Sequence, residues 1–196
     1  MIGALAACGL VDRAGAAVIV GDSSMSTDQL IAEYNSVMGA LGQQDVPGTP
    51  VEINRAMLSS FIVSTLVSDL AAEAGVTASE AELKSVRDSL VAELGSEQAL
   101  LEAAASGAVA PENIDRTLMT TLNYNALGRY LDPTGDETTQ SEAASAAIMK
   151  YASEVGIEVA PRFGAWSAES LAIMGDNNDV SLTTDALAAL LGQPTE

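Results

Sequence analysis

The longest apolar segment of the chain, residues 51–74, has the spacing of a helix that is buried on most of its surface. Its large apolar side chains recur every three or four residues: Ile53, Met57, Leu58, Phe61, Ile62, Leu66, Val67 and Leu70. The arc that they cover is too wide for a helix with one narrow buried face. We therefore predict a central, largely buried helix around which other elements pack.

Helices with clear start and stop signals are predicted on both sides of this segment. Ser26 with Gln29, and Ser79 with Glu82, have the three-residue spacing of a capping box, in which each side chain satisfies a backbone N–H group of the other residue. Residues 43–50 read as a loop, because they contain two prolines and a glycine. The further helices are predicted at 26–41, 79–94, 96–107, 111–131, 138–155 and 185–191.

Short strands are predicted near the two ends of the helical series. Residues 16–20 are rich in Val and Ile and end at a Gly-Asp turn, whereas residues 157–159 alternate in polarity. A further short strand is predicted at 171–174. Because a lone strand is not stable, we expect the first and the returning strand to pair. The predicted fold class is mostly α, a helical domain with its N- and C-terminal strands paired in a small sheet.

The charge of the chain excludes several functions. Its 196 residues include 27 acidic and 8 basic side chains and no histidine, which gives a net charge of −19. Such a chain has little with which to neutralise phosphates or anionic lipid headgroups, so we expect no nucleic-acid partner. Without histidine it lacks the commonest general base and metal ligand.

Acidic pairs do not alter this expectation. Glu80 and Glu82 read as solvated or capping carboxylates, and Asp176 and Asp179 lack the ligand alternation, glycine and distal glutamate of a calcium loop. We therefore predict no catalytic residue, no metal site and no cofactor. No run of about 18 apolar residues occurs, so no helix is expected to span a membrane.

The single cysteine, Cys8, stands in the segment Leu5-Ala6-Ala7-Cys8-Gly9, which resembles the lipobox of bacterial lipoproteins. The resemblance implies a signal segment at 1–8, a linker at 9–15 and a lipid anchor on Cys8, with the protein held outside the cytoplasm at the cell membrane. Two acyl chains would give firm attachment. The segment departs from a full signal peptide, because only seven residues precede Cys8 and none is basic. Two alternatives remain open: the true start of the signal peptide lies upstream of Met1, or Cys8 is an ordinary cysteine and the segment is not a signal peptide.

Three further segments, in this order and spacing, resemble the N-terminal chaperone domain of SurA, PpiD and PrsA-type proteins, which is related to the chaperone part of trigger factor. They are the opening strand and capped helix at 17–30, the apolar helix and following cap at 61–79, and a returning strand with a Pro-Arg-aromatic-Gly-x-Trp signature at 159–166. This signature, Pro161, Arg162, Phe163, Gly164 and Trp166, is similar to that of actinobacterial lipoproteins. The residue before the proline is Ala160 rather than the usual asparagine.

The resemblance covers residues 16–166 as a SurA-N-like helical domain and leaves 167–196 as a C-terminal extension. It implies a chaperone module without a parvulin domain, since about 90 further residues and the parvulin histidines are lacking, and so no prolyl isomerase activity. The implied function is the binding of unfolded or translocating secreted polypeptides in an apolar groove. The alternative is a scaffold lipoprotein that docks one cell-envelope partner. The oligomeric state is not predicted.

The expected client-binding side chains are flexible methionines and aromatic residues at helical spacing. We select Met57, Phe61, Met119, Tyr124 and Tyr130. Ordinary core packing is the alternative role for each of them.

Overall fold

The computed structural model describes residues 15–42 and 48–175. This part of the chain is mostly helical and carries small antiparallel sheets, which confirms the predicted fold class. The helices are α1 (Thr27–Leu41), α2 (Pro50–Ala74), α3 (Glu80–Leu94), α4 (Glu97–Ser106), α5 (Ile114–Leu131) and α6 (Glu137–Glu154), with 3-10 turns η1 (Pro111–Asn113) and η2 (Pro161–Phe163). The strands are β1 (Ala16–Val20), β2 (Ser23–Ser26), β3 (Ile157–Val159), β4 (Ala165–Ser167) and β5 (Ala172–Met174).

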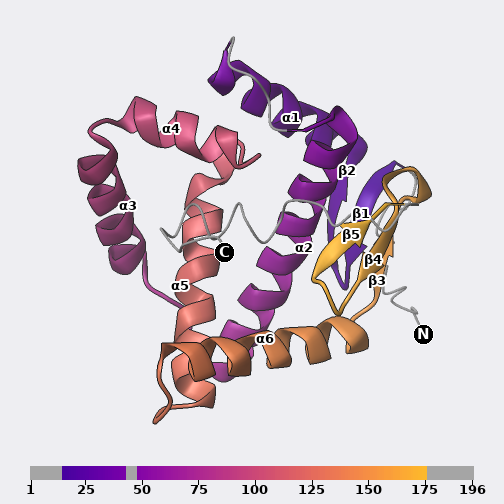
Figure 1. The fold of residues 1–196 in the computed structure, drawn as a ribbon. Helices are drawn as coiled ribbons and strands as arrows, with labels where there is room; N and C mark the ends of the chain where they lie inside the picture. The colour runs from indigo at the N-terminus through magenta and orange to yellow at the C-terminus, as the bar shows by residue number, and fades with distance from the viewer. Residues whose placement is uncertain (1–14, 43–47, 176–196) are drawn as a thin grey trace, which may run out of the picture.

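Helix α2 lies at the centre, as its periodicity predicts. It runs between the strands on one side and α5 on the other, with α1 and α6 across its two ends (Figure 1). Its side chains Leu58, Ile62, Leu66 and Val67 have no exposed surface. By length and composition alone α2 is apolar enough to cross a membrane, contrary to the sequence expectation, but half of its most apolar window is buried inside the fold.

Capping boxes begin three of the helices. Those at Ser26 and Ser79 are the predicted ones, and a third joins Thr49 to Glu52 at the start of α2. Pro50, which the sequence analysis places in a loop, is the first residue of α2. Proline fits this position, because its missing N–H would have no partner within the helix.

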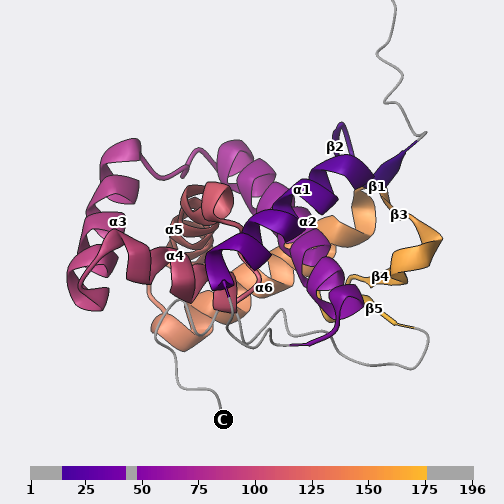
Figure 2. The same cartoon turned by 90° about the horizontal axis from the view of Figure 1, so that it is seen from above.

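The first sheet has the order β2-β1-β3 among the described strands. β1 and β3 are antiparallel, with Val18 opposite Val159 and Val20 opposite Ile157, so the first and the returning strand pair as predicted. Strand β2, which is not predicted from the sequence, forms a hairpin with β1. Figure 2 shows the strands following one another from β2 at the outside, through β1 and β3, towards β4 and β5.

A second small sheet joins β4 to β5. The backbone N–H of Ile173 in β5 donates to the buried hydroxyl of Ser59 in α2, at 2.9 Å. Gly164 leads into β4 with φ of +111°, and a Cβ atom there would collide with the carbonyl oxygen of Met174. The packed body therefore extends at least to Met174, past the boundary at Trp166 that the sequence analysis expects.

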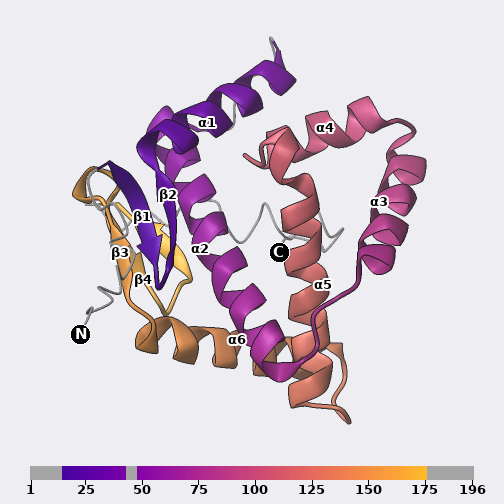
Figure 3. The ribbon, with the colours of Figure 1, turned by 180° about the vertical axis from the view of Figure 1, so that it is seen from behind.

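Buried apolar side chains form two clusters that share α5. The main cluster joins β1, α1, α2, α6 and the later part of α5. The second cluster is made by α3, α4 and the first part of α5 through Leu83, Leu100, Ala104, Val109, Ile114 and Leu118. Figure 3 shows α3 and α4 on the side of α5 that faces away from the sheet. The expectations for Cys8, for the acidic segment 176–179 and for a helix at 185–191 lie outside the described residues.

The bond from Ile173 to Ser59 predicts a large effect of a small substitution. Ser59→Ala leaves the Ile173 N–H buried without an acceptor, which costs about 1–3 kcal/mol of unfolding free energy. The measurement is urea unfolding followed by circular dichroism. Ser68→Ala, at an exposed position of the same helix, is the matched control. Equal midpoints for both variants would contradict this role of Ser59.

The cap of α3 predicts a change in a pKa. The backbone N–H and hydroxyl of Ser79 bond the Glu82 carboxylate at 2.8 and 2.7 Å, and they lower the pKa of Glu82 below 4.5. A lowered folded pKa means that this stabilisation is present above pH 4.5 and is lost as the pH falls through the folded value. In Ser79→Ala the backbone N–H remains and only the hydroxyl bond is lost, so we expect the pKa of Glu82 to rise part of the way towards its ordinary value, measured by NMR titration. Ser85→Ala, exposed on the same helix, should leave it unchanged.

Candidate functional site

The five expected client-binding residues are spread over different environments. Met57 is buried in the main cluster with 3% of its surface exposed, and Phe61 and Tyr124 pack half-buried against the same cluster. Met119 packs against the second cluster. Tyr130, near the end of α5, is 57% exposed. The structure thus brings Met57, Phe61 and Tyr124 to one cluster and leaves only Tyr130 open to solvent.

Tyr124 connects α5 with α6. Its hydroxyl lies 2.7 Å from the hydroxyl of Ser141 and 2.8 Å from that of Ser145, both in α6. One turn further along α5, a Cβ atom at Gly128 would lie 2.7 Å from the carbonyl oxygen of Gln140, so the two helices approach closely there. The Tyr124 side chain packs against the main cluster and its hydroxyl bonds α6, so this side chain is engaged within the fold.

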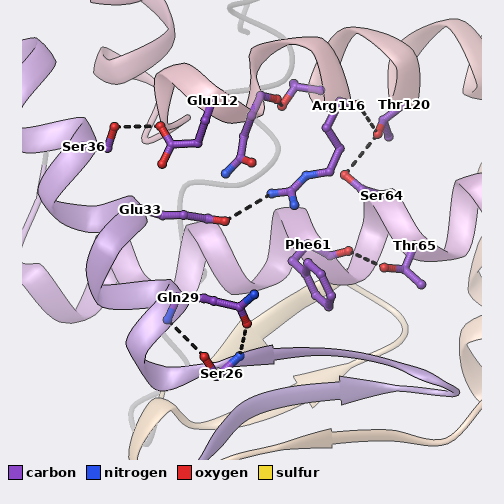
Figure 4. A network of polar contacts seen from close by, with 12 residues as sticks. Ser26, Gln29, Glu33, Ser36, Phe61, Ser64, Thr65, Glu112, Arg116 and Thr120 are labelled. Atoms are coloured by element: carbon purple, nitrogen blue, oxygen red, sulfur yellow. Dashed lines mark hydrogen bonds and ion pairs between the residues drawn. The ribbon is translucent and has the colours of Figure 1, made fainter.

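Phe61 is covered by a charged side chain. The guanidinium group of Arg116, from α5, lies 5.7 Å from the centre of the Phe61 ring, within the range of a cation–π contact (Figure 4). Its other neighbour is Glu33 of α1, at 3.9 Å between Nη2 and the carboxylate oxygen. The Glu33 side chain is only 14% exposed. Arg116 thus joins three helices through one ion pair and one ring.

Two more polar contacts continue this junction, as Figure 4 shows. The hydroxyl of Ser36 in α1 donates to Glu112 of η1 at 2.7 Å, and the buried hydroxyl of Thr120 in α5 donates to that of Ser64 in α2 at 3.0 Å. We call Glu33, Phe61 and Arg116, with these two pairs, the polar junction. Sequence reasoning missed it, because its residues lie far apart in the chain and form no motif.

The signature segment 161–166 ties the returning strand to the start of the fold. Phe163 is buried, and its carbonyl oxygen accepts a bond of 2.7 Å from Nε of Arg55 in α2. Arg162 stacks on the Phe163 ring at 4.9 Å and donates to the hydroxyl of Thr27 at the start of α1. Trp166 is half-buried and lies opposite Ile173 in the second sheet. These contacts are structural ones.

Solvent reaches several large apolar side chains elsewhere. Among the described residues, these are Ile31 (51% exposed), Val51 (47%), Leu94 (41%), Tyr130 (57%) and Leu131 (43%). They come from α1, α2, α3 and α5. Tyr130 and Leu131 are consecutive, and the sequence analysis selected only Tyr130 of the five.

Ion pairs lie along α3 and join it to its neighbours. Arg87 of α3 binds both Glu97 of α4 and Asp115 of α5, and Lys84 pairs with Asp88. In the described ranges, 15–42 and 48–175, no group of three or more acidic or cysteine side chains is placed to hold a metal ion.

No family model, no curated protein and no solved structure matches the chain.

The polar junction predicts coupling between two charges. Arg116→Met keeps an apolar stem over Phe61 but leaves the mostly buried Glu33 without its cation, which should cost about 1 kcal/mol of unfolding free energy. Adding Glu33→Gln should recover part of that loss, measured by urea unfolding of both single variants and the double variant. Strictly additive effects of the two substitutions would contradict the coupling.

Proposed function

We propose that the chain is a non-enzymatic, chaperone-like protein that binds unfolded or translocating secreted polypeptides outside the cytoplasm, held at the cell membrane by a lipid on Cys8. The observation that carries the proposal is the set of large apolar side chains exposed on a strongly acidic molecule. Apolar side chains in water bind the apolar segments that an unfolded chain exposes. The resemblance to SurA-type chaperone domains points to the same function.

The contact surface of this proposal differs from the groove that the sequence suggests. Met57 is enclosed by the main cluster and Tyr124 is occupied by α6, so neither reaches a client unless the helices separate. Tyr130 and Leu131, consecutive and exposed at the end of α5, are directly available. Ile31 of α1 and Val51 of α2 are two further exposed apolar side chains. Short, separate apolar contacts favour weak binding with low specificity, which suits transient capture.

The net charge supports the same function. At −19, the chain and its complexes repel one another, which keeps a protein with a bound apolar client in solution. The same charge disfavours acidic clients. Binding of this kind needs no nucleotide, so a client leaves by dissociation as it buries its own apolar surface.

The test is suppression of aggregation. The purified full chain is added, in near-stoichiometric amounts, to a refolding client that aggregates, and light scattering is recorded. The control is the same client with an equally acidic, inert protein added instead. We expect lower scattering with the chain. Replacing Tyr130 and Leu131 by serine should reduce the effect, whereas Ala92→Ser, at an exposed position of α3, should leave it unchanged.

Each result has a definite meaning. Suppression that survives both serine substitutions would move the contact surface away from the end of α5. No suppression with several unrelated clients would contradict the chaperone proposal. It would favour the scaffold alternative, which pull-down from an envelope extract with the same serine variants would then examine.

A further inference from the structure

Strand β2 forms an outer edge of the first sheet. Among the described strands it pairs only with β1, through Ile19 opposite Ser24 and Val20 opposite Ser23. Gly21, with φ of +54°, is the first of the two residues that connect these strands, a position typical of glycine in a tight hairpin. Because β2 lies at the outside of this sheet (Figure 2), its far side has main-chain groups that β1 does not use.

The register identifies those groups. The N–H of Thr27 donates to the carbonyl of Gly15, on the β1 side, whereas the N–H of Ser26 bonds the side chain of Gln29. Main-chain groups of successive residues in a strand point to opposite edges. The main-chain groups of Thr27 face β1, and those of Ser26 face away from it. Counting back in steps of two, the N–H and C=O of Ser24 also point away from β1.

The two edges of this sheet differ in protection. Proteins commonly block an edge with charged side chains or proline. β3, at the other edge, carries Glu158 and is followed closely by Pro161. β2 consists of three serines and a buried methionine, and the Ser23 and Ser24 side chains are exposed and small. An extended chain can approach Ser24 without meeting a bulky side chain of β2.

We propose that the edge of β2 at Ser24 binds an extended, positively charged segment of a client polypeptide. In antiparallel pairing one client residue exchanges two main-chain hydrogen bonds with Ser24. Exposed Asp22 and Asp28 flank β2 and complement basic client side chains. Arg162, which donates to Thr27 just after β2, is already stacked on Phe163.

This inference rests on the proposed function and names how a client is recognised. Main-chain bonding is independent of client side chains, so it fits a protein that must accept many sequences. Two bonds at a short edge give weak, rapidly reversible binding. The apolar side chains exposed elsewhere would then act on other parts of the same client.

The test uses a fluorescent peptide that alternates Lys with Val and Thr, and an analogue N-methylated at every peptide bond. The analogue keeps the charge and the side chains but cannot donate main-chain hydrogen bonds. Binding to the full chain is followed by fluorescence anisotropy. We expect the analogue to bind up to about tenfold more weakly, the loss that one net hydrogen bond implies, because its carbonyl groups can still accept from the Ser24 N–H.

The matched protein variants are Ser24→Pro and Ser24→Ala. Proline removes the outward N–H, and edge strands tolerate it where the N–H faces solvent. We expect Ser24→Pro to bind the Lys peptide up to about tenfold more weakly than the wild-type chain. Ser24→Ala should bind it as the wild-type chain does. Urea unfolding checks that the variants are folded, and the methylated analogue tests the other bond of the pair, the one accepted by the Ser24 carbonyl, on the unaltered protein.

The outcomes separate this inference from the proposed function. Equal binding of the parent peptide and its methylated analogue, or no binding of either, overturns edge recognition. A folded Ser24→Pro variant that suppresses aggregation as well as the wild-type chain also overturns edge recognition. That result leaves the chaperone function intact. A third result is peptide binding that both methylation and Ser24→Pro weaken, together with no suppression of aggregation by the chain. This result supports recognition at the β2 edge and contradicts the chaperone function.

Discussion

The burial of α2 is the constraint on which the described fold depends. A helix of 25 residues with apolar side chains on most of its surface needs cover from several directions. The strands, α5, α1 and α6 supply that cover, and two of these contacts include a buried hydroxyl of α2. Ser59 receives the backbone of β5, and Ser64 receives Thr120 of α5. These buried hydroxyls fix where the neighbouring elements lie along an otherwise uniform apolar surface.

The pairing of β1 with β3 closes this arrangement. It brings residues about 140 positions apart in the sequence into register and leaves the helices as one long insertion between two strands. The signature segment strengthens the closure, since Arg162 reaches the start of α1 and Arg55 of α2 holds the Phe163 carbonyl. The second cluster is connected to the main cluster through α5 and also through α4, whose Ala105 belongs to the main cluster. The ion pairs of Arg87 hold α3, α4 and α5 together at its surface.

Local signals in the sequence predicted most of the fold, but they did not predict which residues far apart in the chain contact one another. Capping boxes, glycine stops and apolar periodicity located six helices and the pairing strands, because each signal lies within a few residues. The Thr49-Pro50 start of α2 carried the same kind of signal and was missed behind the loop-like prolines. Ala108 takes a left-handed φ of 58°, a conformation that sequence reasoning would reserve for glycine. The polar junction depends on which faces of three helices meet, which no local pattern encodes.

The candidate binding residues show the same division between side-chain type and tertiary position. Methionine and aromatic side chains suit an adaptable binding surface and a core equally well, so their chemistry alone does not separate the two roles. In Met57 the core position prevails, while Tyr130 stays exposed. Under the proposed function, two kinds of contact are available to a client: exposed apolar side chains of the helices and main-chain groups at the edge of β2. Neither is specific for sequence. If the chain binds clients as proposed, selectivity would come from electrostatics, because a surface of strong negative charge favours basic segments and would keep the complex soluble.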